Sequence, residues 1–345
     1  MTLTRLELAN FTAFEHLDLE LSPGVNVFIG ANGTGKTHLL KVLYAACEAT
    51  RGDVDFEDKL VRVFLPWANH FGRLIRRQAD VGHCGIGVYS DDRFLRASFR
   101  SDQMEPGLVE SLRDGVLDWR SERLASVYIP VKEMLANAPG FRSQYALRET
   151  HFEEVYADIL DRAYLPPLRS NADPDRARLL DRLQGVLGGQ VVDEGEEFFL
   201  AGGEGLKLEF TLLAEGYRKL GLLYRLIQNG TLAGGSILFW DEPEANLNPS
   251  MMGTVVDILL ELQRMGVQVF LATHDYVTLK QFDLRSKPEN RVLYHALYRE
   301  NESSGVAVNS TEDYLQIHPN AISDTFADLY DADVKRALAL GGEKE

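Results

Sequence analysis

The eight residues from Gly30 to Thr37, with the sequence GANGTGKT, constrain the fold of this chain more than any other segment. Two glycines bracket four residues ahead of a lysine and a threonine, which is the pattern of a phosphate-binding loop. The apolar run 25–29 before the loop predicts a buried strand, and the apolar spacing over 37–46 predicts a helix. Strand, glycine loop and helix follow in the order that an α/β nucleotide-binding fold requires.

Each residue of this loop has a chemical task in that interpretation. The glycines let backbone N–H groups and the helix N-terminus face phosphate oxygens. Lys36 would reach the β- and γ-phosphates and act in catalysis, and the Thr37 hydroxyl would ligate Mg²⁺. We therefore expect ATP and Mg²⁺ as ligands, although a glycine-rich turn without a ligand is the simpler alternative. The residues predicted to contact the nucleotide here are Asn32, Gly33, Thr34, Gly35, Lys36, Thr37 and His38.

A second segment supplies adjacent acids far downstream. The apolar run 236–240 ends at Asp241 and Glu242, and Pro243 stops the strand just after them. Such a strand delivers carboxylates to the carboxyl edge of a parallel sheet. Asp241 is the predicted Mg²⁺ partner, through water because Mg²⁺ keeps much of its hydration shell. Glu242 is the predicted general base for the attacking water. In isolation, two adjacent acids more often mark a solvated turn.

A third apolar run, 267–272, ends at Thr273-His274-Asp275. A lone histidine after a strand is usually only a polar loop residue. Here it follows one element beyond the acid pair, and a histidine can hydrogen-bond a γ-phosphate without a permanent charge. His274 is therefore the third predicted catalytic residue, with Lys36 and Glu242.

The order of these segments, together with the Asn-Leu-Asn-Pro loop at 246–249, resembles the ABC-type ATPases, specifically their RecF/SMC/OLD-like branch. The opening segment 3–21 is similar to the amino-terminal hairpin of that branch. The resemblance covers 1–46 and about 207–280. It implies a P-loop NTPase of ABC type, with a mixed central sheet, an antiparallel β-subdomain and an inserted helical arm. It also places 10–14 near adenine and ribose, unless the aromatic residues of that turn are simple core.

The resemblance further implies head-to-tail dimers, in which a Ser-Gly-Gly signature of one subunit caps the γ-phosphate held by the other. The matching segment here is Ala214-Glu215-Gly216. Gly216 keeps a backbone that can approach phosphate at a helix N-terminus, so it is a predicted nucleotide contact. The missing serine hydroxyl removes a hydrogen bond worth about 0.5–1.5 kcal/mol, which weakens a sandwich without forbidding it. Arg218 or Lys219 would compensate electrostatically, or else lie solvated on an amphipathic helix.

The middle of the chain matches the family loosely. Residues 125–130 look like the strand that precedes the family's glutamine loop, so Glu133 is predicted to stand in for that glutamine as a contact to Mg²⁺ or water. A plain surface helix after Pro130 would give the same residues. We divide the chain into a first part of the ATPase core at 1–129, an inserted helical arm at 130–188 and a second part of the core at 189–345.

Outside the motifs, turn residues and apolar spacing predict further elements. They are a hairpin over 85–99, a hairpin over 190–200, a closing strand pair at 291–298 and 305–309, and a helical tail over 322–340 with its acids outward.

Composition limits the partners. The net charge of −16, from 36 basic and 52 acidic residues, repels nucleic acid, so any DNA contact needs a local basic patch or a partner. The best local candidate is 59–77, where basic and aromatic residues alternate; an amphipathic helix with its apolar face inward is the more frequent explanation. The basic residues of the candidate stretch are Lys59, Arg62, Arg73, Arg76 and Arg77.

No apolar run is long enough to span a bilayer and no leader begins the chain, so we expect no membrane partner and a cytoplasmic location. Two cysteines without metal spacing suit a reducing compartment.

The leading functional hypothesis is an ABC-type ATPase that forms a homodimer, or a higher oligomer, around ATP·Mg²⁺ and switches a separately encoded effector. The resemblance associates it with DNA maintenance, DNA repair or antiphage defence. A nucleotide-gated scaffold that holds a toxin or nuclease and hydrolyses slowly is the alternative, favoured by the altered signature. A transporter subunit is a weaker third. No Toprim-like acid cluster follows the ATPase segments, so a nuclease activity would belong to another protein.

Overall fold

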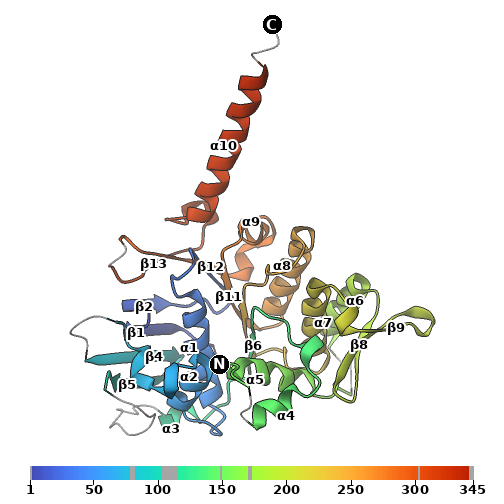
Figure 1. The fold of residues 1–345 in the computed structure, drawn as a ribbon, viewed down its shortest axis with the longest axis horizontal. Helices are drawn as coiled ribbons and strands as arrows, with labels where there is room; N and C mark the ends of the chain where they lie inside the picture. Colours follow the sequence, from blue (N-terminus) through green and yellow to red (C-terminus); the bar gives the residue numbers. More distant parts are fainter. Residues whose placement is uncertain are drawn as a thin grey trace.

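A computed structural model describes residues 2–77, 82–102, 116–147, 150–169, 173–301 and 304–341. Its central feature is a six-stranded mixed sheet in the order β13-β12-β3-β11-β10-β6 (Figure 1). Neighbouring strands run parallel except β12 and β13, which pair antiparallel. The strands are β3 Val25–Gly30, β6 Ser126–Ile129, β10 Ile237–Asp241, β11 Gln268–Thr273, β12 Val292–Tyr298 and β13 Ala307–Thr311.

The two faces of this sheet belong to two hydrophobic clusters. On β10, Ile237 and Phe239 join the cluster that also holds α1 and α2, whereas Leu238 and Trp240 join the cluster on the other face. This alternation explains why the strand reads as a continuous apolar run, since both faces are covered. The helices of the described residues are α1 Lys36–Ala49, α2 Phe56–Phe64, α3 Val116–Trp119, α4 Phe141–Ala146, α5 Glu154–Ala163, α6 Pro174–Leu187, α7 Glu215–Gln228, α8 Pro249–Arg264, α9 Tyr276–Arg285 and α10 Ala321–Gly341.

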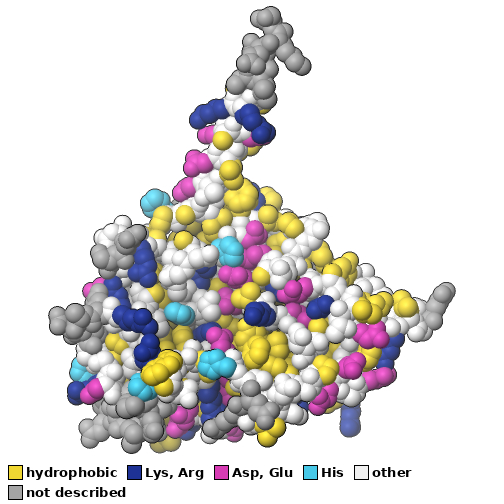
Figure 2. Space-filling model, viewed as in Figure 1, with side chains coloured by type: hydrophobic (Ala, Val, Ile, Leu, Met, Phe, Trp, Pro, Cys, Tyr) yellow, Lys and Arg dark blue, Asp and Glu magenta, His cyan; other side chains and the backbone are white. Residues whose placement is uncertain are grey.

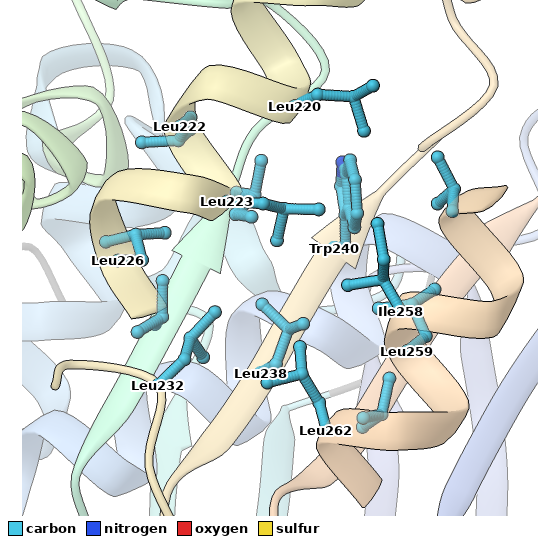
Figure 3. Close-up of a cluster of buried hydrophobic side chains, with 14 of the residues drawn as sticks. Leu220, Leu222, Leu223, Leu226, Leu232, Leu238, Trp240, Ile258, Leu259 and Leu262 are labelled. Atoms are coloured by element: carbon cyan, nitrogen blue, oxygen red, sulfur yellow. The ribbon is translucent and has the colours of Figure 1, made fainter. Parts of the chain in front are cut away.

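Trp240 lies between α7 and α8 and fixes the end of β10. Figure 3 shows Leu220 and Leu223 of α7 on one side of the tryptophan and Ile258 of α8 on the other. Because this cluster is buried, the strand that ends in Asp241 is held from both flanking helices.

Two antiparallel sheets flank the central one. A four-stranded sheet has the order β2-β1-β4-β5 and a three-stranded sheet the order β7-β8-β9. The hairpins predicted over 85–99 and 190–200 are confirmed. The aromatic residues of the first turn, Phe11 and Phe14, are both completely buried, as the core alternative requires. The strands are β1 Arg5–Phe11, β2 Phe14–Glu20, β4 His83–Ser90, β5 Arg93–Arg100, β7 Gln190–Glu194, β8 Glu197–Ala201 and β9 Lys207–Glu209.

The helices within 130–188 do not stand apart from the core. Leucines of α6 and apolar residues of α5 belong to the same buried cluster as α7 and α8. The division of the chain at 130 and 188 stays a prediction.

The predicted closing strand pair is present as β12 and β13. After it, α10 projects away from the body of the molecule (Figure 1). Among the helices of the described residues, none combines the length and the apolar character that a membrane span requires.

We expect His295 of β12 to lower the stability of the fold in acid. Its ring is buried between Ser310 (Nδ1···Oγ 2.8 Å) and Asn26 (Nε2···Oδ1 3.1 Å), and burial lowers the histidine pKa from 6.5 to about 3. The unfolded chain therefore takes up a proton between these pH values that the folded site refuses, so the free energy of unfolding falls as pH drops through this window. We expect His295→Gln to flatten that fall relative to wild type. Urea unfolding at about pH 7 and about pH 4.5 measures it. His16→Gln, at an exposed histidine, should leave the fall unchanged, and an equal flattening in both variants would contradict the assignment.

Candidate active site

The phosphate loop adopts a conformation that only glycine allows at two of its positions. Gly30 has φ 153°, and a Cβ there would lie 2.4 Å from the Leu297 carbonyl oxygen. Gly35 has φ 90°, and a Cβ there would lie 2.8 Å from the Phe14 ring. The Thr34 hydroxyl donates to the Ala31 carbonyl at 2.8 Å and closes the loop. The loop therefore leaves its tip exposed at the N-terminus of α1, where backbone N–H groups are available to an anion.

Lys36 lies folded against its own loop. Its ammonium donates to the carbonyl oxygens of Gly30 (2.7 Å) and Ala31 (3.0 Å). Burial lowers the lysine pKa, and the charges of Glu242 and Asp241 oppose this shift. The structure thus brings the lysine and the two downstream acids together at one edge of the sheet.

Asp241 and Thr37 form the candidate metal pair. The Thr37 hydroxyl donates to one carboxylate oxygen of Asp241 at 3.1 Å, and the Tyr128 hydroxyl donates to the other at 3.2 Å. Burial raises the Asp241 pKa to about 6; the Thr37 hydrogen bond opposes this shift and the Glu242 charge adds to it. Tyr128 was not predicted. Tyr128 of β6 lies opposite Phe239 of β10. In the sequence, a single tyrosine within an apolar strand is the feature that could have indicated its role.

These oxygen donors fit Mg²⁺, which takes one or two protein oxygens and completes its shell with water and phosphate oxygens. Within the described ranges no group of three or more His, Cys, Asp or Glu could hold a metal ion by itself. Thr37 and Asp241 would therefore supply the protein ligands, and the nucleotide would supply others.

Glu242 and His274 meet at the ends of β10 and β11. The His274 Nδ1 atom lies 3.1 Å from the Glu242 carboxylate. Glu242 has φ 47°, an uncommon conformation for a residue with a side chain, and strain of this kind gathers at functional sites. The turn places its carboxylate partly in solvent while Asp241, one residue before, stays buried.

Glu244 orients the turn that carries His274 and was not predicted. It accepts hydrogen bonds from the Thr273 hydroxyl (2.7 Å) and from the His274 backbone N–H (3.1 Å). Burial raises the glutamate pKa, and these hydrogen bonds oppose that shift. The sequence shows Glu244 within the Asp-Glu-Pro-Glu segment, but it does not show that Thr273 of β11 is the partner of this glutamate.

Gly216 lies in the first turn of α7 against the loop at 246–248. A Cβ on Gly216 would lie 2.9 Å from the end of the Leu247 side chain, so the helix start packs closely against this loop of the same chain. Its predicted contact with a nucleotide remains a prediction. The N-cap residue, Ala214, offers no side-chain hydrogen bond to the helix.

Lys219 and the half-buried Arg218 both donate hydrogen bonds to backbone carbonyls of this chain. The buried Lys219 ammonium donates to the backbone carbonyls of Ala245 and Glu242 (3.4 Å for the latter). Arg218 donates to the carbonyls of Leu213 (2.8 Å) and Thr211 (2.9 Å). Lys219 therefore supports the turn that carries Glu242, the predicted general base. The sequence did not predict this contact because it joins two segments that are distant in the chain.

Glu133 caps the short helix that follows β6. Its carboxylate accepts the backbone N–H groups of Leu135 and Ala136, and burial raises its pKa. The same carboxyl group lies within electrostatic range of Arg218 and Glu215 at the start of α7. Its role as a metal or water contact stays a prediction.

The basic stretch 59–77 is largely tied to acids of this chain. Lys59 bridges Glu154 (2.7 Å) and Asp158 (2.6 Å) on α5, and Arg62 also pairs with Glu154. Arg76 pairs with Glu15 at 2.6 Å. These internal pairs compete with any use of the stretch for nucleic acid.

The end of that stretch borders a hollow of about 880 Å³ beside the phosphate loop. Two buried polar atoms that line it, Thr12 Oγ1 and His38 Nδ1, have no hydrogen-bond partner within the described residues. Burial lowers the His38 pKa to about 4, so the ring is neutral. The hollow is also lined by Ala13, Phe64, Pro66, Trp67, Arg73, Leu74, Ile75, Arg76, Arg77 and Arg299.

Replacing Lys219 should separate binding from turnover. In Lys219→Met the carbonyls of Glu242 and Ala245 lose a buried charged donor, a loss worth about 1.5–3 kcal/mol in general. We expect kcat for ATP hydrolysis to fall by at least about tenfold, while ATP affinity changes by less than about threefold. Steady-state kinetics and equilibrium ATP binding give the two values. Lys280→Met, at an exposed lysine of α9, is the matched control. A fall in affinity equal to the fall in kcat would contradict a bracing role.

The fold and this sheet edge define a phosphate-loop nucleotide-binding protein of ABC type. A family model described as "AAA domain, putative AbiEii toxin, Type IV TA system" matches residues 25–280, and the chain therefore belongs to this family.

Curated relatives match over a shorter segment. The DNA replication and repair protein RecF of Bacillus mycoides is 35% identical over 81 residues, 24% of this chain and 22% of the relative. The RecF protein of Renibacterium salmoninarum is 38% identical over 82 residues, 24% of this chain and 21% of the relative. The chain thus spans less than a quarter of the length of these relatives.

Solved structures match the whole fold. An Smc head bound to the C-terminal winged-helix domain of ScpA is 14% identical with a TM-score of 0.55, over 92% of this chain and 100% of that one. The Smc head with an extended coiled coil, bound to the C-terminal domain of ScpA and derived from Pyrococcus furiosus, is 12% identical with a TM-score of 0.52, over 96% and 99%. These likenesses establish a shared fold.

Proposed function

We propose that this protein binds and hydrolyses ATP with Mg²⁺ and uses that cycle to switch a partner. One observation carries the proposal. The lysine of the phosphate loop, the Thr37–Asp241 pair and the Glu242–His274 pair lie together at the carboxyl ends of the parallel strands β3, β10 and β11, where ligands of such folds bind.

The residues have separable tasks in this proposal. Lys36 leaves its loop carbonyls and neutralises the β- and γ-phosphates, while Thr37 and Asp241 hold Mg²⁺. Glu242 orients or deprotonates the attacking water. His274, held by Glu242 at Nδ1, presents its other ring nitrogen to the γ-phosphate.

The base of the nucleotide would occupy the hollow beside Thr12 and His38. Buried polar atoms normally have partners, so the two unpartnered atoms there favour a polar ligand. Thr12→Val should weaken ATP binding without weakening binding of inorganic tripolyphosphate, which has no base. Equal weakening of both ligands, measured by calorimetry, would place the base elsewhere.

ATP would also join two copies head to tail, with the start of α7 of one copy over the γ-phosphate of the other. The Smc heads bound to ScpA show that proteins of this fold bind partners, and the RecF relatives are named for DNA replication and repair. The family description names a toxin system. These likenesses favour a cytoplasmic switch for a separately encoded effector, in DNA maintenance or antiphage defence.

The test combines turnover and mass. Phosphate release is measured with Mg²⁺ and with EDTA, and the mass of Glu242→Gln is measured by light scattering with ATP and with ADP. Mg²⁺-dependent release by wild type, and a mass of the variant that is larger with ATP than with ADP, support the proposal. Binding of ATP without release by wild type would favour the alternative, a nucleotide-gated scaffold, which the missing cap at Ala214 supports.

A further inference from the structure

The C-terminal helix α10 has little contact with the body of the protein. Its base is held by stacking of Phe326 on Tyr276, with ring centroids 4.4 Å apart, and by Ile322, which packs against the core. From Asp324 to Leu338 every residue is exposed. A helix of 21 residues extends about 30 Å at about 1.5 Å per residue, so most of α10 lies in solvent (Figure 1).

The exposed part of α10 carries an apolar face. Five large apolar side chains on α10 are each between 39% and 72% exposed. Four of them recur at every fourth residue from Phe326 to Leu338, and Leu329 follows Phe326 by three residues, which places the five on one side of the helix. A helix in solvent gains most of its stability by packing such a face, and a contiguous apolar surface marks an interaction site. The five residues are Phe326, Leu329, Tyr330, Val334 and Leu338.

Acidic and basic residues occupy different parts of α10. Figure 2 shows acidic side chains on α10 nearer the body and basic ones farther out. The segment 321–333 carries four aspartates and no basic residue, and the segment 334–338 carries two basic residues and no acid. The charged residues are Asp324, Asp328, Asp331, Asp333, Lys335 and Arg336.

We propose that α10 pairs with α10 of a second copy of this chain in antiparallel orientation. Antiparallel pairing can set Asp328 of each helix opposite Arg336 of the other, with Asp331 opposite Asp333 near the centre, whereas parallel pairing would align all four aspartates of one helix with the same four of the other. The helix dipoles favour the same orientation. The arrangement also repeats one surface on both copies, as a two-fold interface requires.

The pattern of apolar residues fixes a register. If Phe326 lies opposite Leu338 of the second copy, Tyr330 lies opposite Val334, and Ala332 lies at the centre. Large apolar side chains then meet at both ends of the face and next to its centre, while Leu329 lies opposite Lys335. This interface lies apart from the phosphate loop and does not rest on the proposed function, so α10 pairing should need no nucleotide.

The first test is sedimentation equilibrium of the full chain in EDTA without nucleotide. Wild type should show a monomer–dimer equilibrium, and Tyr330→Glu with Leu338→Glu should raise its dissociation constant by at least about a hundredfold. Leu284→Glu, the same change at an exposed leucine of α9, should leave it unchanged. A wild type that stays monomeric at about 100 µM, or a double variant that dimerises equally, would overturn the proposal. So would a monomeric wild type that binds a different protein through α10.

The second test addresses orientation through charge. A variant with Lys335→Glu and Arg336→Glu is acidic along α10, and one with Asp328→Lys, Asp331→Lys and Asp333→Lys is predominantly basic. Each alone should lose self-association by at least about tenfold, and an equimolar mixture should recover it. A mixture that stays monomeric would contradict charge pairing. Retained helical circular dichroism in each variant separates this result from unfolding.

Disulfide trapping tests the register directly, since the native Cys47 and Cys84 are buried. The proposed register sets Ala327 opposite Ala337 of the second copy. A mixture of Ala327→Cys and Ala337→Cys chains should form a mixed disulfide dimer on mild oxidation. Disulfide dimers formed as readily by either variant alone would indicate parallel pairing and overturn the proposal.

Discussion

Glu242→Gln is expected to lower the single-turnover rate of ATP hydrolysis by about a hundred- to ten-thousand-fold, the usual contribution of a general base. The change keeps the shape of the side chain and its contact with His274, so ATP binding should be retained. Because the strained turn is a backbone feature, the fold should also be retained. Rapid-quench measurement with excess protein over ATP gives the rate of the chemical step.

Glu261→Gln is the matched control, because it makes the same chemical change on α8, where Glu261 pairs with Arg264 at the surface. It should hydrolyse ATP as wild type does. Hydrolysis by Glu242→Gln at the wild-type rate would remove Glu242 as the base. Hydrolysis by neither wild type nor variant would favour the scaffold.

Lys36→Met is expected to weaken ATP binding by about 10- to 150-fold, which corresponds to the about 1.5–3 kcal/mol of a hydrogen bond to a charged group. The buried ammonium is the only side-chain cation of the phosphate loop 30–37, and methionine keeps its length without its charge. Calorimetric titration with ATP and Mg²⁺ measures the affinity.

Lys207→Met, at a lysine of β9 paired with Glu194, should bind ATP as wild type does. If Lys36→Met bound ATP with wild-type affinity, the loop would not be a phosphate site and the proposed function would fail with it. Equal weakening in the two lysine variants would indicate a non-specific charge effect.

The order of the local sequence patterns was sufficient to predict which segments form the candidate site. Glycine spacing at 30–35 and an apolar run ending in Asp241 are local features, and parallel strands bring their carboxyl ends to one edge. The structure accordingly brings Lys36 close to Asp241. Their chemical roles remain predictions until hydrolysis is measured.

Contacts between segments that are distant in the chain could not be predicted from the sequence. Tyr128 reaches Asp241 only because β6 and β10 pair in one register, and Lys219 reaches the Glu242 carbonyl only through the placement of α7. The basic stretch was ambiguous for the same reason, since the acids that neutralise Lys59 lie on α5, nearly a hundred positions away. Periodicity predicted a helical tail but not that it leaves the body.

The start of α7 packs closely against the loop at 246–248, since a Cβ on Gly216 would lie 2.9 Å from the end of the Leu247 side chain. Lys219 of the same helix donates to the backbone carbonyl of Glu242. A neighbour that displaced α7 would therefore disturb contacts on both sides of the turn that carries the predicted general base.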